Sequence, residues 1–327
     1  MNVAILGAGN WGTTLAILLS KKVSKIFLWS IEEPDKIERT RENKKYLPGF
    51  KIPENVKVTG DLSETLSSSE IVIFAVPSHA MREVAQKVSK MKKNLIAVSV
   101  AKGIELHTFK RMTQILEEEL NTDKVCALSG PTIAREVVRG LPTACVCASK
   151  NKYIGEKIQK LFYTDTFRVY YSDDVIGVEL GGALKNVIVL AAGMCDGLNL
   201  GVNAKSALLT RGLYEMQKLG VKMGAKPLTF AGLSGMGDLI TTAFSQYSRN
   251  RYVGEQLGKG RKLKDILSEM VMVAEGVKTT KAVYELSQKY KIEMPITKVV
   301  YEILYENLPP KEGIKKLMER PLKSELG

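Results

Sequence analysis

The sequence predicts an α/β half with a doubly wound sheet, followed by an all-α half. In the first half, short apolar runs of strand length alternate with helical patterns as far as about residue 172, which is typical of strand–helix–strand units around a parallel sheet. From residue 173 onward the apolar spacing is helical, with almost no strand pattern. We therefore expect two domains, residues 1–174 and 175–327, and the chain is long enough for two cores.

The first predicted strand, residues 3–6, is apolar and uncharged, as in a strand that is buried on both faces. Gly7, Gly9 and Gly12 follow with the spacing G-x-G-x-x-G, and residues 13–19 have a helical pattern. In that motif the first glycine permits the turn, the second lets the backbone approach a pyrophosphate, and the third lets the helix pack on the strand. The diphosphate lies at the helix N-terminus. The stretch therefore predicts a Rossmann-type dinucleotide site; the alternative is a glycine-rich turn that only packs.

The choice of coenzyme depends on the end of the second predicted strand, residues 25–29, which lies beside the adenosine ribose in such folds. An acidic residue there binds the 2′-hydroxyl of NAD, whereas a basic residue accommodates the 2′-phosphate of NADP. The chain continues Ser-Ile-Glu-Glu, with no Arg or Lys in the turn. Glu32 and Glu33 could favour NAD, or they could begin the next helix beside Pro34. We expect NAD or NADP as the cofactor, with NAD favoured.

The rest of the first half continues the alternation of strands and helices. Predicted strands cover residues 56–59, 71–76, 95–100, 125–128, 143–148 and 167–171, and predicted helices cover 81–88, 109–120 and a segment from 133. Lys102 follows one strand at its carboxyl end, where ligands of open α/β sheets bind; the alternative is a solvated loop lysine. After strand 125–128, the turn predicts that backbone N–H groups of Gly130 to Ala134 could face an anion.

The second half begins with a long apolar helix. Asp173 or Asp174 is suited to cap its N-terminus. Residues 175–194 are apolar nearly all round, so the helix should be buried, and Lys185 and Asn186 are among its few polar residues. Burial lowers the pKa of a lysine and makes it a proton donor and acceptor near neutrality. Lys185 is therefore a candidate catalytic residue, the alternative being a lysine that reaches solvent at a helix edge.

Two further segments supply polar groups. Residues 232–242 form a glycine-rich loop that carries Asp238, which could pair with Lys185 and oppose the fall of its pKa. Residues 248–251 read Ser-Arg-Asn-Arg, and a guanidinium beside an amide and a hydroxyl suits a phosphate monoester. The plain alternatives are a helix cap for Asp238 and a solvated cluster for the arginines. From residue 263 onward, the pattern predicts amphipathic helices.

Composition excludes several classes of function. The formal net charge of +13 indicates either a lysine-rich solvated surface or a field that attracts anionic ligands; without a dense basic run interleaved with aromatics, we expect no nucleic-acid partner. His79 and His107 are the only histidines, so we expect no His-based metal site and no Ser-His-Asp triad. The N-terminus lacks a signal-peptide pattern, and the longest apolar run, 187–195, is too short for a bilayer. We expect a cytoplasmic protein without membrane insertion.

Four cysteines are present without a C-x-x-C pair. Cys145 and Cys147 lie on one predicted strand, and we expect them to point to opposite faces and not to form a bridge. Reduced core cysteines are typical of a cytoplasmic protein.

Taken together, the motifs resemble bacterial NAD(P)-dependent glycerol-3-phosphate dehydrogenase. The resemblance covers nearly the whole chain, in the stretches GAGNWGTTLA, YLPG, AKGIE, SGPTIAREV, ELGGALKNVIVLAAG, GLSGMGDLITT, YSRNR and AEGVKTT. It implies an N-terminal Rossmann domain, a C-terminal all-helical domain and a homodimer. The implied reaction interconverts dihydroxyacetone phosphate and sn-glycerol 3-phosphate, which supplies the backbone of phospholipids.

The resemblance also implies roles for individual residues, with Lys185 as the catalytic proton donor and acceptor. Those implied to line the substrate are Lys102, Gly130, Thr132, Asp238, Ser248, Arg249 and Asn250, with Asn186 and Thr242 nearby. Those matching cofactor contacts, beside the three glycines of the motif, are Asn10, Trp11, Tyr46, Lys102, Ala134, Arg249, Val273 and Glu275. One departure puts NADP preference in doubt: many family members carry an arginine shortly after the second strand, where this chain has Ile31 and Glu32.

Parts of the pattern are also compatible with two alternative functions. A dehydrogenase of the hydroxyacyl-CoA or 6-phosphogluconate type is one, but the catalytic His-Glu pair of the former has no histidine available in the helical half. A non-catalytic nucleotide sensor is the other, and the presence of Lys185, Asp238 and Arg249 speaks against it.

Overall fold

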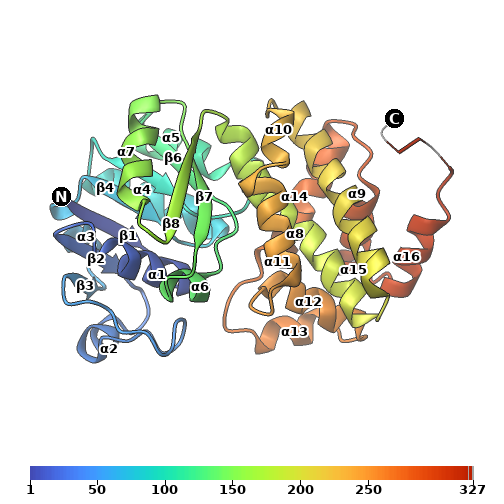
Figure 1. The fold of residues 1–327 in the computed structure, drawn as a ribbon, viewed down its shortest axis with the longest axis horizontal. Coiled ribbons are helices and arrows are strands. Elements are labelled where there is room, and N and C mark those ends of the chain that lie inside the picture. Colours follow the sequence, from blue (N-terminus) through green and yellow to red (C-terminus); the bar gives the residue numbers. More distant parts are fainter. Residues whose placement is uncertain (323, 326–327) are drawn as a thin grey trace.

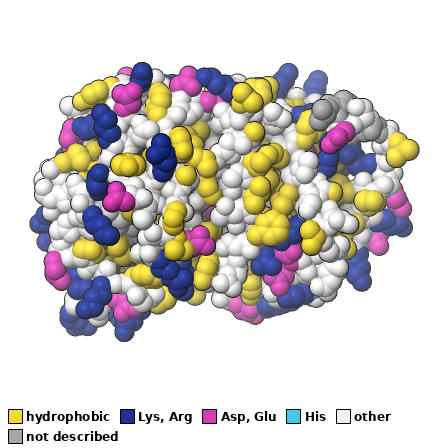
Figure 2. All heavy atoms as spheres, viewed as in Figure 1, with side chains coloured by type: hydrophobic (Ala, Val, Ile, Leu, Met, Phe, Trp, Pro, Cys, Tyr) yellow, Lys and Arg dark blue, Asp and Glu magenta, His cyan; other side chains and the backbone are white. Residues whose placement is uncertain are grey.

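The computed structural model describes residues 1–322 and 324–325, and it has a sheet-containing N-terminal half and a helical C-terminal half (Figure 1). This arrangement confirms the predicted fold class. Lysine and arginine side chains are distributed over both halves of the face shown in Figure 2, interspersed with acidic ones. That distribution agrees with a charged, solvated surface.

One sheet of eight strands organises the N-terminal half, in the order β3-β2-β1-β4-β5-β6-β7-β8. The strands are β1 (Asn2–Leu6), β2 (Lys25–Trp29), β3 (Val56–Thr59), β4 (Ile71–Phe74), β5 (Ile96–Ser99), β6 (Val125–Ser129), β7 (Thr143–Ala148) and β8 (Phe167–Ser172). All neighbours pair in parallel except β6 and β7, which are antiparallel. The order reverses beside β1, where β2 lies on one side and β4 on the other; in open α/β sheets, ligands bind at this switch point, at the carboxyl ends of the strands.

Helices cover both faces of the sheet because its strands are apolar on both sides. They are α1 (Asn10–Leu19), α2 (Pro34–Thr40), α3 (Leu62–Ser67), the 3₁₀ turn η1 (Ser78–Ala80), α4 (Met81–Met91), α5 (Met112–Leu120), α6 (Ala134–Val138) and α7 (Lys152–Phe162). α1 and α7 contribute to the core on one face, and α3, α4 and α5 to the core on the other.

Two helix starts differ by three residues from the sequence expectation. α1 begins at Asn10, directly after the glycine turn, rather than at residue 13. α5 begins at Met112 rather than at residue 109, because His107 and Phe109 both have positive φ and Arg111 is extended. Apolar periodicity does not report such backbone reversals.

The expected orientation of the two strand cysteines was wrong. Residues two positions apart on a strand share a face, and Cys145 and Cys147 both lie in the same core as Cys126. The Cys126 and Cys147 sulfurs are 2.9 Å apart, and all four thiols are free and buried. Burial raises the pKa of the Cys147 thiol well above its usual range, so this residue is an inert member of the core.

The C-terminal half packs around α8 (Val175–Gly197), which begins at the cap Asp174, whose side chain accepts from the Gly177 amide. The other elements are α9 (Gly201–Lys222), α10 (Pro227–Phe230), the π-helical turn η2 (Leu233–Gly237), α11 (Asp238–Phe244), α12 (Arg249–Gly258), α13 (Leu263–Glu269), α14 (Glu275–Lys289), α15 (Pro295–Tyr305) and α16 (Pro310–Met318). α8 is long and apolar enough to span a membrane, but 94% of its apolar window is buried in the protein. It is therefore the core helix of this half.

Glycines allow α12 to cross α8 in close contact. A Cβ added to Gly254 would lie 2.0 Å from the Leu190 carbonyl oxygen, and one added to Gly193 would lie 2.1 Å from the Arg251 carbonyl oxygen. Real Cβ atoms do not approach so closely, so only glycine fits at either position. This crossing holds the start of α12 near the middle of α8.

Candidate active site

Two lysines share one buried carboxylate where the two halves meet. Lys102 Nζ lies 2.7 Å from Asp238 Oδ2, and Lys185 Nζ lies 3.2 Å from Asp238 Oδ1. Lys185 also donates to Thr242 Oγ1 at 2.6 Å, and Lys102 donates to the Gly130 carbonyl at 2.9 Å. Asp238 and Lys185 are almost fully buried, whereas Lys102 is partly exposed.

Each member of this cluster comes from a different element. Lys102 follows β5 at its carboxyl end, Lys185 is in the middle of α8, and Asp238 is the first residue of α11. α8 can approach the sheet because residue 182 is glycine: a Cβ there would lie 2.5 Å from Ser129 Oγ and 3.5 Å from Lys102 Cγ. A side chain at residue 182 would therefore push the helix, and Lys185 with it, away from Lys102.

The Lys185 ammonium has an altered acidity. Burial lowers its pKa to about 8, and the positive charges of Lys102 and Arg249 act in the same direction, while Asp238 opposes them. A pKa near 8 lets one amine donate and accept a proton near neutrality. Asp238 therefore holds the Lys185 side chain in position and also limits how far burial lowers its pKa.

A chain of amide contacts runs from the cluster toward α14. Asn186 donates to the Lys102 carbonyl at 3.3 Å and accepts from Asn250 Nδ2 at 2.9 Å. Asn250 in turn accepts from the Gly276 amide at 3.0 Å. These contacts join the loop after β5 to α8, α12 and α14, so the predicted residues Asn186 and Asn250 lie together.

Arg249 begins α12, next to Ser248, whose hydroxyl caps the helix by accepting from the Arg251 amide at 3.1 Å. Arg249 is partly buried, and burial lowers its pKa while Glu275 opposes that change. Within residues 1–322 and 324–325, no side chain or carbonyl forms a hydrogen bond or ion pair with its guanidinium. An arginine without an internal partner is available for an anionic ligand.

The turn after β6 contributes a carbonyl to the cluster. Gly130 has a φ of +145°, and its carbonyl accepts from Lys102 Nζ and, at 3.2 Å, from Thr132 Oγ1. Ala134 begins α6, and its carbonyl accepts from Thr14 of α1 at 3.5 Å. Gly130 and Thr132 thus lie beside the lysine cluster, and Ala134 lies beside the first helix of the sheet half.

The glycine turn after β1 fits a dinucleotide. Gly7 has a φ of +109°, and a Cβ at Gly12 would lie 1.9 Å from the Gly7 carbonyl oxygen. A Cβ at Gly9 would meet no protein atom within 4 Å, so the side on which a diphosphate would approach is open. Asn10 and Trp11 form the first turn of α1, whose free N–H groups face this position.

The remaining predicted cofactor residues lie in two places. Glu275, at the start of α14, accepts from the Ser78 amide at 2.9 Å and the Ser78 hydroxyl at 2.5 Å, which joins the two halves. Val273 lies on the exposed segment just before it. Tyr46 lies apart from the lysine cluster and donates to Glu32 at 2.9 Å.

Sequence reasoning missed two residues that support these positions. Ser78, the partner of Glu275, follows Pro77 without any local motif. Asn43 is buried and donates to the Ala8 carbonyl at 2.6 Å and to Thr13 Oγ1 at 3.0 Å. The only signal for Asn43 was a polar residue in a loop that ends Leu-Pro-Gly.

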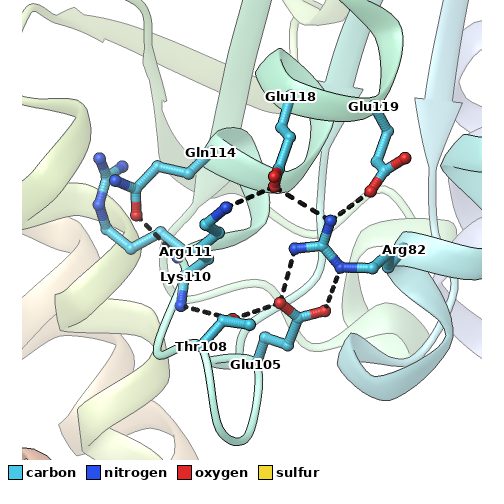
Figure 3. A network of polar contacts seen from close by, with 8 residues as sticks. All are labelled: Arg82, Glu105, Thr108, Lys110, Arg111, Gln114, Glu118 and Glu119. Atoms are coloured by element: carbon cyan, nitrogen blue, oxygen red, sulfur yellow. Dashed lines mark hydrogen bonds and ion pairs between the residues drawn. The ribbon is translucent and has the colours of Figure 1, made fainter.

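An ion-pair network anchors the loop that carries Lys102 (Figure 3). Arg82 of α4 contacts both carboxylate oxygens of Glu105 at 2.8 Å, and it also pairs with Glu118 and Glu119 of α5. These partners raise the pKa of Arg82. A bidentate arginine–carboxylate pair three residues after Lys102 limits the movement of that loop.

In chemical terms, the site joins a proton donor with a pKa near 8, a second ammonium, and a guanidinium that has no acceptor among the described residues. It lies at the carboxyl edge of a sheet whose first turn has the form of a dinucleotide site. No group of three or more His, Cys, Asp or Glu side chains that could hold a metal occurs in the described part of the chain.

Comparison with known proteins agrees with this arrangement. Residues 2–154 match the family model for the NAD-dependent glycerol-3-phosphate dehydrogenase N-terminus, and residues 174–315 match that for the C-terminus. The glycerol-3-phosphate dehydrogenase [NAD(P)+] of Thermoanaerobacter sp. (strain X514) is 51% identical over 100% of this chain and 99% of its own length.

Solved structures give the same result. The glycerol-3-phosphate dehydrogenase of Coxiella burnetii has a TM-score of 0.94 and 38% identity, over 98% of this chain and 99% of that chain. The Saccharomyces cerevisiae enzyme has a TM-score of 0.82 and 26% identity, over 98% and 99%. The chain belongs to the glycerol-3-phosphate dehydrogenase family.

Proposed function

We propose that the protein is an NAD(P)-dependent sn-glycerol-3-phosphate dehydrogenase, which interconverts dihydroxyacetone phosphate and sn-glycerol 3-phosphate. The observation that carries this proposal is the buried Lys185 amine, held by Asp238 and Thr242 beside Lys102. The family relationship over the whole chain agrees with it.

In the reducing direction, the Lys185 ammonium donates a proton to the ketone oxygen as negative charge develops there. Lys102, whose ammonium contacts the other oxygen of the Asp238 carboxylate, stabilises that charge as a second cation. The reduced nicotinamide, when bound, supplies the hydride. In the oxidising direction, the neutral Lys185 amine takes the proton from the hydroxyl.

Arg249 and Asn250 bind the phosphate of the substrate. Among the described residues, no group forms a hydrogen bond or ion pair with the guanidinium, and Asn250 is fixed through Asn186 and Gly276. Binding at the phosphate then orients the ketone toward Lys185. Residues proposed to complete the substrate site are Lys102, Gly130, Thr132, Asn186, Asp238, Thr242 and Ser248. Residues proposed to contact the coenzyme are Gly7, Gly9, Asn10, Trp11, Gly12, Tyr46, Lys102, Ala134, Arg249, Val273 and Glu275.

Further assignments belong to the same proposal. The sheet half, residues 1–174, binds the coenzyme, and the helical half, residues 175–327, carries the catalytic amine. The enzyme works in the cytoplasm as a homodimer, without nucleic acid and without membrane insertion, and it supplies glycerol 3-phosphate for phospholipid synthesis.

Coenzyme oxidation assays test this function. The purified protein is given dihydroxyacetone phosphate with NADH and, separately, with NADPH. Unphosphorylated dihydroxyacetone and glyceraldehyde 3-phosphate serve as control substrates. We expect oxidation with dihydroxyacetone phosphate and a much lower kcat/KM for both controls. Equal rates with the unphosphorylated ketone would contradict the phosphate assignment, and no oxidation with either coenzyme would contradict the function.

A further inference from the structure

Two adjacent glutamates after β2 differ in their surroundings. Glu33 has a φ of +42°, stands at the N-cap position of α2 without a capping hydrogen bond from its side chain, and pairs with Lys36 at 2.9 Å. Glu32 is oriented differently, because Ser30 Oγ donates to its carbonyl at 2.7 Å and accepts from its amide at 3.3 Å. This turn directs only one of the two carboxylates toward the loop that follows α2.

That carboxylate is held in place from the loop. Glu32 Oε2 accepts from Lys45 Nζ at 2.7 Å and from the Tyr46 hydroxyl at 2.9 Å. Both contacts hold the pKa of Glu32 below its usual range, so the group is a carboxylate at neutral pH. Its second oxygen accepts from no group in the described part of the chain, and it remains free to accept from a ligand.

The same loop is tethered to the glycine turn. Asn43 donates to the Ala8 carbonyl at 2.6 Å, and its side-chain oxygen accepts from the Tyr46 amide at 3.3 Å. The amide of Gly7 also donates to the Trp29 carbonyl at 3.1 Å, so the ends of β1 and β2 are adjacent. Glu32 therefore has a fixed position relative to the turn at which a dinucleotide diphosphate binds.

We propose that Glu32 selects the coenzyme: its carboxylate accepts a hydrogen bond from the adenosine 2′-hydroxyl of NAD and repels the 2′-phosphate of NADP. The proposal rests on the use of a dinucleotide coenzyme proposed above. Two cations near Glu32, Lys45 and Arg41, already have acidic partners. Lys45 pairs with Glu32 itself at 2.7 Å, while Arg41 pairs with Glu38 at 2.9 Å and donates to the Val56 carbonyl at 2.7 Å.

Direct binding of coenzyme fragments tests the proposal. Titration calorimetry on the whole chain compares ADP-ribose with its 2′-phosphate, in the wild type, in Glu32→Gln and in Glu33→Gln. The control variant loses the same charge from the neighbouring residue. We expect the wild type to bind ADP-ribose at least about tenfold more tightly, the scale of one hydrogen bond to a charged group. Glu32→Gln should bring the two affinities within about threefold, mainly by strengthening binding of the 2′-phosphate.

The ratio of the wild-type affinities for ADP-ribose and its 2′-phosphate tests the proposal even if a variant fails to fold. Equal affinities, tighter binding of the 2′-phosphate, or no binding of either fragment would overturn the proposal, as would an equal effect of Glu33→Gln. The outcome is separable from the proposed function. Dihydroxyacetone phosphate reduction with equal use of both coenzymes would leave the function standing and remove the role of Glu32. If the protein prefers ADP-ribose but does not reduce dihydroxyacetone phosphate, the role of Glu32 stands and the proposed function fails.

Discussion

Asp238→Asn should shift the pH range in which the enzyme works. Asp238 is the one partner that raises the pKa of Lys185, against burial and two cations that lower it to about 8. At the 3.2 Å separation of Lys185 Nζ and Asp238 Oδ1, the attraction is about 5 kcal/mol at an effective dielectric constant of about 20, and about 1.3 kcal/mol under water-like screening. A nearby opposite charge shifts a pKa by about one to three units. The Lys185 pKa should therefore fall from about 8 to between about 5 and about 7 in the variant.

The sign of the effect differs between the two reaction directions. Reduction of dihydroxyacetone phosphate needs the ammonium form, so kcat/KM falls as the pH rises through the Lys185 pKa, and this decline should begin at lower pH in the variant. Oxidation of glycerol 3-phosphate needs the neutral amine, so its rise should also begin at lower pH. Initial rates of coenzyme oxidation and reduction across the pH range measure both.

A matched control exists on α8. Asp196 accepts from Lys205 at 2.9 Å and from Arg251 at 2.7 Å, so it also bridges two cations. Asp196→Asn should leave both pH profiles unchanged. If the variant at residue 238 is too slow to assay, the Cε chemical shift of isotopically labelled lysine reports the same pKa. An unmoved profile in Asp238→Asn, or an equal shift in Asp196→Asn, would refute the assignment of the titrating group to Lys185.

Four further outcomes are expected. Lys185→Ala should lower kcat at least about a hundredfold in steady-state assays, whereas Lys205→Ala, which removes a buried lysine of α9, should leave it nearly normal; near-normal turnover of the first variant would remove Lys185 from its role. Arg249→Ala should chiefly raise the KM for dihydroxyacetone phosphate, and an unchanged KM would argue against phosphate binding there. Burial raises the pKa of Glu215 from 4.5 to about 7, so the stability that its protonated form contributes is lost as the pH rises through that interval; Glu215→Gln should flatten the pH dependence of Tm, and an unaltered dependence would exclude this group. Gly254→Ala should lower the unfolding free energy by about 1–3 kcal/mol in denaturant titrations, because its Cβ would lie 2.0 Å from a backbone oxygen of α8; full stability would show that the two helices can separate without cost.

Local patterns in the sequence were enough to predict most of the fold. The apolar runs at β2, β3 and β7 match the observed strands residue for residue, and the length of α8 follows from its cap at Asp174 and its apolar circumference. The reversed direction of β7 relative to β6 was not predicted, because an apolar strand has the same pattern in either direction. Backbone reversals at His107 and Phe109 were likewise invisible to periodicity.

Some contacts between distant segments of the site could be predicted from the sequence, and others could not. The pairing of Lys185 with Asp238 could be anticipated, because a lysine in an apolar helix requires a counter-charge and the glycine-rich loop offers one. The contact between Ser78 and Glu275 spans 197 positions, and neither residue lies in a pattern that requires the other. The choice between Glu32 and Glu33 depends on a turn formed by a serine hydroxyl, which composition does not specify.

The excess positive charge of the site suits a phosphorylated substrate. Lys102 and Lys185 share one carboxylate, and Glu275 attracts Arg249 without a direct ion pair, so these three cations outnumber the two carboxylates. The Arg249 guanidinium is partly buried, so it has already lost part of its hydration, and its pKa is lowered for the same reason. A phosphate that arrives there gains charge-assisted hydrogen bonds without displacing an internal acceptor. For a protein that only needed a stable interface, an apolar side chain at residue 249 would pack as well without leaving a cation unpaired. This arginine therefore indicates an anionic ligand. Because Arg249 is next to Asn250, that ligand would lie close to the hydrogen bonds that connect Asn250, through Asn186, to the Lys102 carbonyl.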